Sequence, residues 1–106
     1  MYEFKGQTVS SGTSLVGYVE ATYEELVSAF GEPTYDEPSA DEKVSTEWNL
    51  KFYDEDWDRE VVATIYDWKD YDGGETSRSG KPYRWHVGGK IPAALWAVQE
   101  HLGIDA

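Results

Sequence analysis

The sequence contains no cysteine, one methionine and only nine lysines and arginines among its 106 residues. The missing cysteine excludes disulfide bonds, thiolate nucleophiles, iron–sulfur clusters and cysteine-bearing zinc sites. No apolar run approaches the roughly 20 residues that cross a bilayer, and the first ten residues lack the apolar core of a signal peptide. These absences predict a soluble, cytoplasmic protein whose fold depends on neither disulfides nor a membrane anchor.

Acidic side chains are what the sequence has in excess. Twenty-one aspartates and glutamates against nine lysines and arginines give a formal net charge of -12. Residues 20–60 hold fourteen acids and three bases, whereas residues 81–106 hold two acids and three bases. This charge argues against a general surface that binds nucleic acid or an anionic membrane, and it favours a partner with a basic surface.

Hydrophobic periodicity predicts one α+β domain spanning residues 1–106. Thr22 and Glu25 have the spacing of a capping box, which predicts a helix over 22–30. A second apolar helical face predicts a helix over 91–102. Strands are expected at 14–20, 44–53, 61–68 and 83–87, the last ended by the glycine pair that follows it. We therefore expect an antiparallel sheet of about four strands with two helices packed on it.

Motifs that carry known chemistry are missing from the sequence. It contains no G-x-S-x-G, no phosphate-binding G-x-x-x-x-G-K and no H-E-x-x-H. Asp54, Asp56 and Asp58 have the alternate spacing of a calcium loop, but Arg59 stands where an EF-hand needs glycine. The sequence therefore predicts a non-catalytic protein without cofactor or metal site, and it leaves open weak cation binding by the acidic loops.

Two acidic segments, residues 32–42 and 54–60, flank the predicted strand 44–53. Antiparallel pairing places them either on one surface or at opposite ends of the sheet, and a DNA mimic needs carboxylates in rows. Trp57 stands among the acids of the second segment, either as an interface anchor in a charged rim or as part of the core. The candidate partner-binding residues are Glu37, Asp41, Glu42, Asp54, Glu55, Asp56, Trp57 and Asp58.

The basic segment near the end of the chain suggests an alternative site. Glycines there would let a ligand approach the backbone, and the cations would complement an anion such as a phosphate-bearing small molecule. The candidate ligand-binding residues are Lys81, Arg84, His86, Gly88, Gly89 and Lys90.

Four segments of the chain resemble small acidic proteins encoded by bacteriophages, particularly those that infect actinobacteria. They are EELVSAFGEPTY (24–35), STEW (45–48), ATIYDWK (63–69) and WHVGG (85–89). The group has no established common activity, so the resemblance transfers no functional residue.

What the resemblance implies is a biological setting, the cytoplasm of an infected bacterial host. There we expect a non-catalytic inhibitor that binds a host nucleic-acid-binding defence complex, of CRISPR or restriction type, through an acidic, DNA-mimicking surface. Such an inhibitor binds neither nucleic acid nor a membrane directly. The alternative is a small scaffold or ligand-sequestering protein that binds an anionic ligand near residues 81–90.

Overall fold

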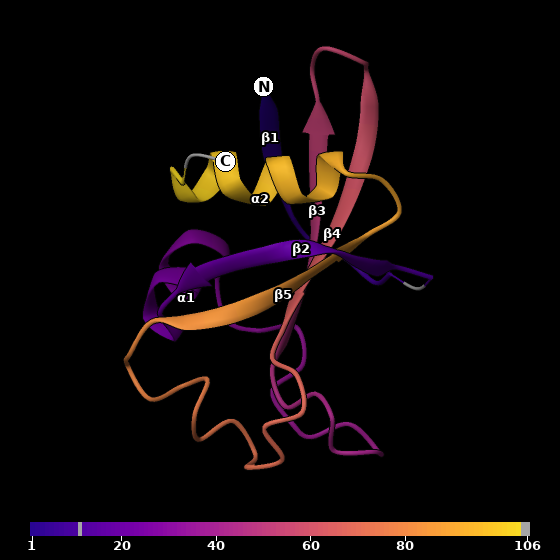
Figure 1. The fold of residues 1–106 in the computed structure, drawn as a ribbon. Helices are drawn as coiled ribbons and strands as arrows, with labels where there is room; N and C mark the ends of the chain where they lie inside the picture. The colour runs from indigo at the N-terminus through magenta and orange to yellow at the C-terminus, as the bar shows by residue number, and fades with distance from the viewer. Residues whose placement is uncertain (11, 105–106) are drawn as a thin grey trace.

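Five strands and two helices make up the part of the chain that the computed structural model describes, residues 1–10 and 12–104. In chain order they are β1 (Tyr2–Gln7), β2 (Ser14–Ala21), α1 (Tyr23–Phe30), β3 (Glu47–Asp54), β4 (Arg59–Tyr66), β5 (Tyr83–Gly89) and α2 (Ala93–Leu102). The strands form one antiparallel sheet in the order β1-β3-β4-β5-β2 (Figure 1). The predicted α+β fold is confirmed, with one strand more in the described residues than the sequence suggested.

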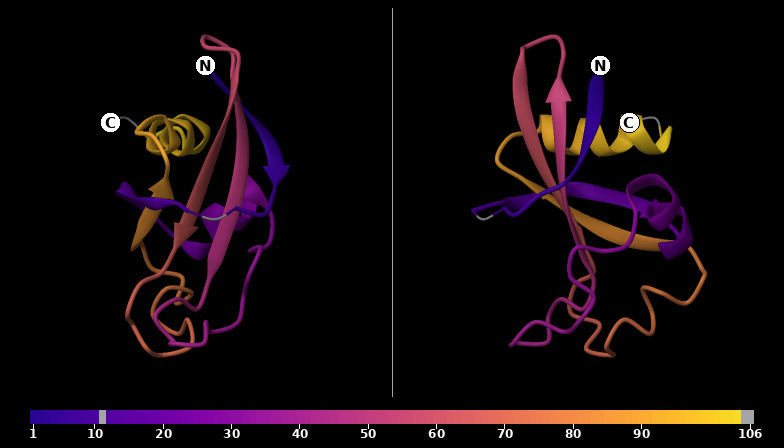
Figure 2. Two further views of the ribbon diagram at one scale, coloured as in Figure 1. Left: turned by 90° about the vertical axis from the view of Figure 1, so that its right-hand side faces the viewer. Right: turned by 180° about the vertical axis from the view of Figure 1, so that it is seen from behind.

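Both helices pack against the same face of the sheet, which we call the inner face. Helix α2 contacts β1, β2, β4 and β5, and it lies beside β3 and β4 in a side view (Figure 2). At the end of α1, the Phe30 ring lies 5.2 Å from Phe4 and 6.2 Å from Phe52 between ring centroids. The alternate side chains of the strands form the opposite, outer face, away from both described helices.

Two tryptophans form the centre of the core. Trp48 on β3 and Trp85 on β5 are fully buried and meet edge to face, with ring centroids 5.4 Å apart. Each indole N–H donates to a backbone carbonyl, that of Gly31 at 2.9 Å and that of Ala21 at 3.0 Å. Because the buried N–H groups are satisfied, the large rings contribute their apolar area without an unpaired donor.

The predicted capping box is confirmed at the start of α1. The Thr22 hydroxyl accepts a hydrogen bond from the Glu25 backbone N–H at 3.1 Å, and the Glu25 carboxylate accepts from the Thr22 N–H at 2.9 Å. Gly31 follows the last helical residue with a φ of 89°, a value that favours glycine. Helix α1 therefore begins and ends where its sequence indicates.

Strand β1 was not predicted. It pairs with β3 and places Tyr2 and Phe4 against the core, while Glu3 and Lys5 stay exposed. This alternation is visible in the sequence, but only two apolar rings carry it. This short segment forms a strand because the edge of β3 offers backbone groups with which it can pair.

Strand β5 continues through the glycine pair that was expected to end it. Gly89 pairs with Ala63 of β4, and Gly88 pairs with Leu15 of β2. A Cβ atom at Gly89 would lie 2.3 Å from the Ala94 Cβ, so the missing side chain lets the start of α2 approach the sheet. That prediction was wrong because these glycines serve close packing and not a turn.

Both edge strands carry an irregularity. The pairing of β1 with β3 shifts register between Phe4 and Gln7, and the pairing of β2 with β5 shifts between Leu15 and Gly17. Gly6, inside the first shift, has a φ of 102°. Each edge therefore contains a bulge.

Candidate functional site

The two acidic segments lie at opposite ends of β3 and not on one surface. Segment 32–42 precedes the strand and segment 54–60 follows it, and Figure 1 shows the two at opposite ends of the molecule. The eight residues of β3 place its first and last Cα atoms about 23 Å apart at roughly 3.3 Å per residue. The structure therefore separates the predicted partner-binding residues into two groups, Glu37, Asp41 and Glu42 at one end and Asp54 to Asp58 at the other.

Asp54 holds the turn between β3 and β4 together. Its carboxylate is only 1% exposed. It accepts hydrogen bonds from the Asp56 and Trp57 N–H groups, at 3.1 and 3.4 Å, and from the Arg59 guanidinium at 3.2 Å. A carboxylate used in this way positions the turn and is not presented to a partner.

The hairpin tip, residues 55–58, projects its side chains into solvent. Trp57 is 73% exposed, so of the two interpretations of this residue the structure places it outside the core. Glu55, Asp56 and Asp58 are exposed around it, and the Arg59 guanidinium lies 5.7 Å from its ring centroid. The tip is thus an aromatic side chain surrounded by carboxylates at the end of the β3–β4 hairpin.

The three aspartates of the calcium-like spacing do not converge. Asp54 binds Arg59, Asp56 pairs with the terminal amino group at 2.9 Å, and Asp58 accepts a hydrogen bond from the Tyr53 hydroxyl. Within residues 1–10 and 12–104, no group of three or more His, Cys, Asp or Glu side chains is placed to hold a metal ion.

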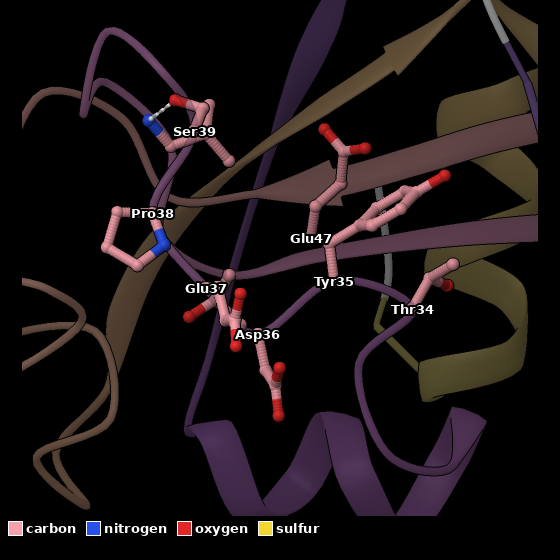
Figure 3. A pocket seen from close by; sticks show the side chains of 9 residues that line it. Thr34, Tyr35, Asp36, Glu37, Pro38, Ser39 and Glu47 are labelled. Atoms are coloured by element: carbon pink, nitrogen blue, oxygen red, sulfur yellow. Dashed lines mark hydrogen bonds between the residues drawn. The ribbon is translucent and has the colours of Figure 1, made fainter.

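The first acidic segment borders an open pocket of about 490 Å³ (Figure 3). Its lining residues are Thr34, Tyr35, Asp36, Glu37, Pro38, Ser39, Val44, Thr46 and Glu47. Beside the pocket, the hydroxyl of Ser39 and the backbone N–H of Lys43 donate to Asp41 and hold its pKa below the usual range. Asp41 therefore shapes the loop, whereas Glu37 and Glu42 are exposed and form no ion pair with another described residue.

Glu47 is the half-buried carboxylate of this pocket. Burial raises its pKa above the ordinary value of 4.5, a hydrogen bond with the Asn49 side chain opposes the shift, and Asp67 adds to it. The pKa of Glu47 is therefore higher in the folded state than in the unfolded state. The free energy of unfolding is greatest while Glu47 is protonated, and it falls as the pH rises through the folded-state pKa.

The Glu47→Gln variant is therefore expected to have a higher free energy of unfolding than the wild type at pH 7. The gain should shrink to nothing below about pH 4, where the carboxyl is protonated in both states. Urea unfolding across this pH range measures the difference. Glu37→Gln removes the same charge from an exposed position of the pocket, and an equal gain in that control would contradict a burial effect.

The alternative ligand-binding residues are also separated by the fold. Lys81 precedes β5 and Lys90 follows it, so the length of the strand lies between them. Gly88 is buried against the Thr64 hydroxyl, and Gly89 lies under α2. Arg84 and His86 share a location on the outer face, where the alternation of β5 also places Gly88.

Sequence reasoning missed the residues that join Arg84 and His86 there. The cross-strand register places Tyr66 of β4 and Tyr18 of β2 on either side of His86, and Trp68 lies nearby. The alternation of side-chain direction along each strand indicates that Tyr18, Tyr66 and His86 point to the same face of the sheet. The neighbourhood itself depends on β2 pairing with β5, which no local pattern specifies.

Comparison of this chain with protein-family models, with characterised proteins and with solved structures gives no match. Among the described residues, neither helix has the length and apolar character needed to span a membrane. The hairpin tip and the outer face are therefore interpreted from their own chemistry.

Proposed function

We propose that this protein is a non-catalytic binding protein that docks its hairpin tip on the basic surface of a nucleic-acid-binding partner. The observation that carries the proposal is the 73% exposed Trp57 among the carboxylates of the tip. A large exposed ring supplies apolar area to bury, and the surrounding carboxylates supply complementarity to lysine and arginine. In the setting implied by the phage-protein resemblance, the partner is a host defence complex of CRISPR or restriction type, which the protein inhibits by occupying its DNA-binding surface.

The separation of the acidic segments limits how far the protein imitates DNA. Duplex DNA carries one charge per roughly 1.7 Å along its axis. The hairpin that contains the second acidic segment protrudes at one end of the molecule (Figure 2), and the carboxylates at its tip are exposed, whereas the first segment lies at the far end of β3. The proposed contact is therefore a charged tip inserted into a basic groove, and not a continuous row of carboxylates along the molecule.

The two components of the tip contribute differently. Burying the exposed part of Trp57 removes on the order of 150 Å² from water, a gain of up to roughly 4 kcal/mol. Carboxylates at the rim of an interface contribute less affinity, because water and salt screen them, but they steer association. We therefore expect Trp57 to set the affinity and the carboxylates to set the rate of association and the salt dependence.

A triple variant of the tip, Glu55→Lys, Asp56→Lys and Asp58→Asn, is expected to abolish binding to the partner, because lysines facing a basic surface add a repulsion that the Trp57 contact does not offset. Asparagine is chosen at Asp58 because its φ of 48° lies in the left-handed region that asparagine tolerates. Immobilised wild-type and variant proteins are compared for what they capture from a bacterial lysate at low and high salt, measured by mass spectrometry. The wild type should lose its partner at high salt, and the variant should capture nothing at either.

The matched control changes the first acidic segment by Asp36→Lys, Glu37→Lys and Glu42→Asn, again two charge reversals and one neutralisation. Glu42 has a φ of 59°, which makes asparagine the suitable replacement there too. This control should capture the partner, and Trp57→Ala should weaken capture by at least about tenfold at low salt, where the wild type retains its partner. Normal capture by the tip variant, or equal loss in both triple variants, would contradict the assignment to the tip.

A further inference from the structure

Four aromatic side chains gather on the outer face at one end of the sheet. We call Tyr18, Tyr66, Trp68 and His86 the aromatic platform. The His86 ring lies at the centre, with its centroid 4.9 Å from Tyr18, 5.4 Å from Tyr66 and 6.0 Å from Trp68. Tyr18 and Trp68 are each 38% exposed, so the platform presents ring surface to solvent.

Cations surround this platform although the chain as a whole is strongly acidic. The Arg84 guanidinium lies 3.9 Å from the Tyr18 ring centroid, and Lys69 and Lys43 lie 5.5 and 6.0 Å from the Trp68 ring. Arg84 and Lys69 form no ion pair with a described carboxylate, and Lys43 pairs only with Asp41, at 3.8 Å. Three of the nine lysines and arginines therefore lie against two exposed rings.

Acidic groups mark the borders of the platform. Glu47 is the cross-strand neighbour of Tyr66, and Glu20 stands opposite Arg84 in the pairing of β2 with β5. Asp70 accepts a hydrogen bond from the Tyr83 hydroxyl at 2.5 Å. The cations are thus flanked by carboxylates, and the positive region covers little more than the rings themselves.

The imidazole at the centre has an unused hydrogen-bonding atom. His86 Nδ1 is buried and has no hydrogen-bond partner among the described residues. Burial lowers the pKa of His86 and the Arg84 charge lowers it further, while the Asp70 charge opposes the shift. Because Nδ1 is buried, a ligand reaches it only where the side chains around it move aside, and it would then supply the partner that the described residues do not.

We propose that the aromatic platform binds a nucleoside monophosphate, with the base stacked on the rings and the phosphate held by Arg84. Aromatic side chains stack on any base, and a guanidinium matches the geometry of phosphate. A cationic ligand is disfavoured because the three cations beside the exposed rings would repel it. A longer nucleic-acid strand is disfavoured because its further phosphates would lie beyond the three local cations. There they would be repelled by a protein of net charge -12, since electrostatic repulsion acts over a Debye length of about 8 Å.

Calorimetric titration with AMP, GMP, CMP and UMP tests the proposal, and Trp68 offers a fluorescence signal for the same binding. Arg84→Gln and Trp68→Leu are each expected to weaken binding about tenfold, from the loss of a charge-assisted hydrogen bond or of stacking. Lys5→Gln removes a cation from β1, and Trp96→Leu removes an exposed tryptophan from α2. These two controls should bind as the wild type does.

Three further probes identify which part of the ligand is recognised. The nucleoside without phosphate should bind about tenfold more weakly than the monophosphate. Inorganic phosphate alone should give no heat, and a short single-stranded oligonucleotide should bind more weakly than its monomer. The triple variant of the hairpin tip should bind nucleotide normally, because the platform does not depend on the function proposed for the tip.

The proposal is overturned if none of the four nucleotides binds at millimolar concentration. It is equally overturned if Arg84→Gln and Trp68→Leu, shown to be folded by circular dichroism, bind as tightly as the wild type. Tighter binding of the oligonucleotide than of the monomer would also refute it, in favour of a strand as the ligand.

Discussion

Replacing Asp67 by alanine is expected to lower the free energy of unfolding by about 3–5 kcal/mol. Asp67 is 2% exposed, and one carboxylate oxygen accepts from the backbone N–H groups of Ser45, at 2.7 Å, and Thr46, at 3.0 Å. The other accepts from the Ser77 hydroxyl at 2.9 Å. Alanine leaves both buried N–H groups without an acceptor, which costs far more than the lost hydrogen bonds are worth in water.

The position of Asp67 explains why the effect should reach beyond one side chain. The carboxylate joins the end of β4 to the segment before β3, and through Ser77 to the loop that leads into β5. Urea unfolding measures the overall loss, and hydrogen exchange should detect earlier opening of residues 36–46. Asp67→Asn keeps an acceptor oxygen and should lose only about 1 kcal/mol. An alanine variant within 0.5 kcal/mol of the wild type, inside the usual scatter of surface substitutions, would refute the role of this carboxylate.

Replacing Gly89 by alanine is expected to lower the free energy of unfolding by about 3 kcal/mol, at the upper end of overpacking effects. The new Cβ would lie 2.3 Å from the Ala94 Cβ and 3.4 Å from the carbonyl oxygen of Ile91. Neither atom is at the end of a flexible side chain, so β5 and α2 must move apart. Thermal and urea unfolding both report the loss.

A matched control and a compensating change separate this clash from other effects of alanine. Gly17→Ala also places a Cβ close to another atom, 2.5 Å from the Leu95 Cδ2, but a leucine side chain can rotate away. It should therefore cost less than Gly89→Ala. Adding Ala94→Gly to Gly89→Ala should recover stability, less the roughly 1 kcal/mol that glycine costs in a helix. A double variant no more stable than Gly89→Ala would show that the two Cβ atoms are not the cause.

Elements defined by local patterns were predictable from the sequence. The capping residues Thr22 and Glu25 indicated the start of α1, the period-two alternation indicated β3, and a run that is apolar on both faces indicated β4. The start of β3 was placed too early, at 44 and not at Glu47, because Ser45 and Thr46 direct their N–H groups to the Asp67 carboxylate. Only the folded chain brings that acceptor to them.

The candidate site was predictable to the same extent. A hairpin is formed by residues close together in the sequence, so the acidic character of the tip could be predicted. Whether Trp57 folds back onto the sheet depends instead on whether the core has room for its ring. Trp48 and Trp85 already fill the centre of that core. The aromatic platform was hidden for a different reason, because Tyr18 and His86 meet only through the pairing of β2 with β5, strands far apart in the sequence.

The bulges in β1 and β2 bear on how molecules of this protein meet at high concentration. An edge strand with regular, unpaired backbone groups recruits a strand from another molecule and so begins a fibril. Here both edges of the sheet change register within the strand, so neither offers a long regular template. The repulsion between acidic molecules disappears at low pH, because the carboxylates become protonated. The bulges in the edge strands do not depend on pH. Resistance to edge-to-edge aggregation is therefore built into the fold as well as into its charge.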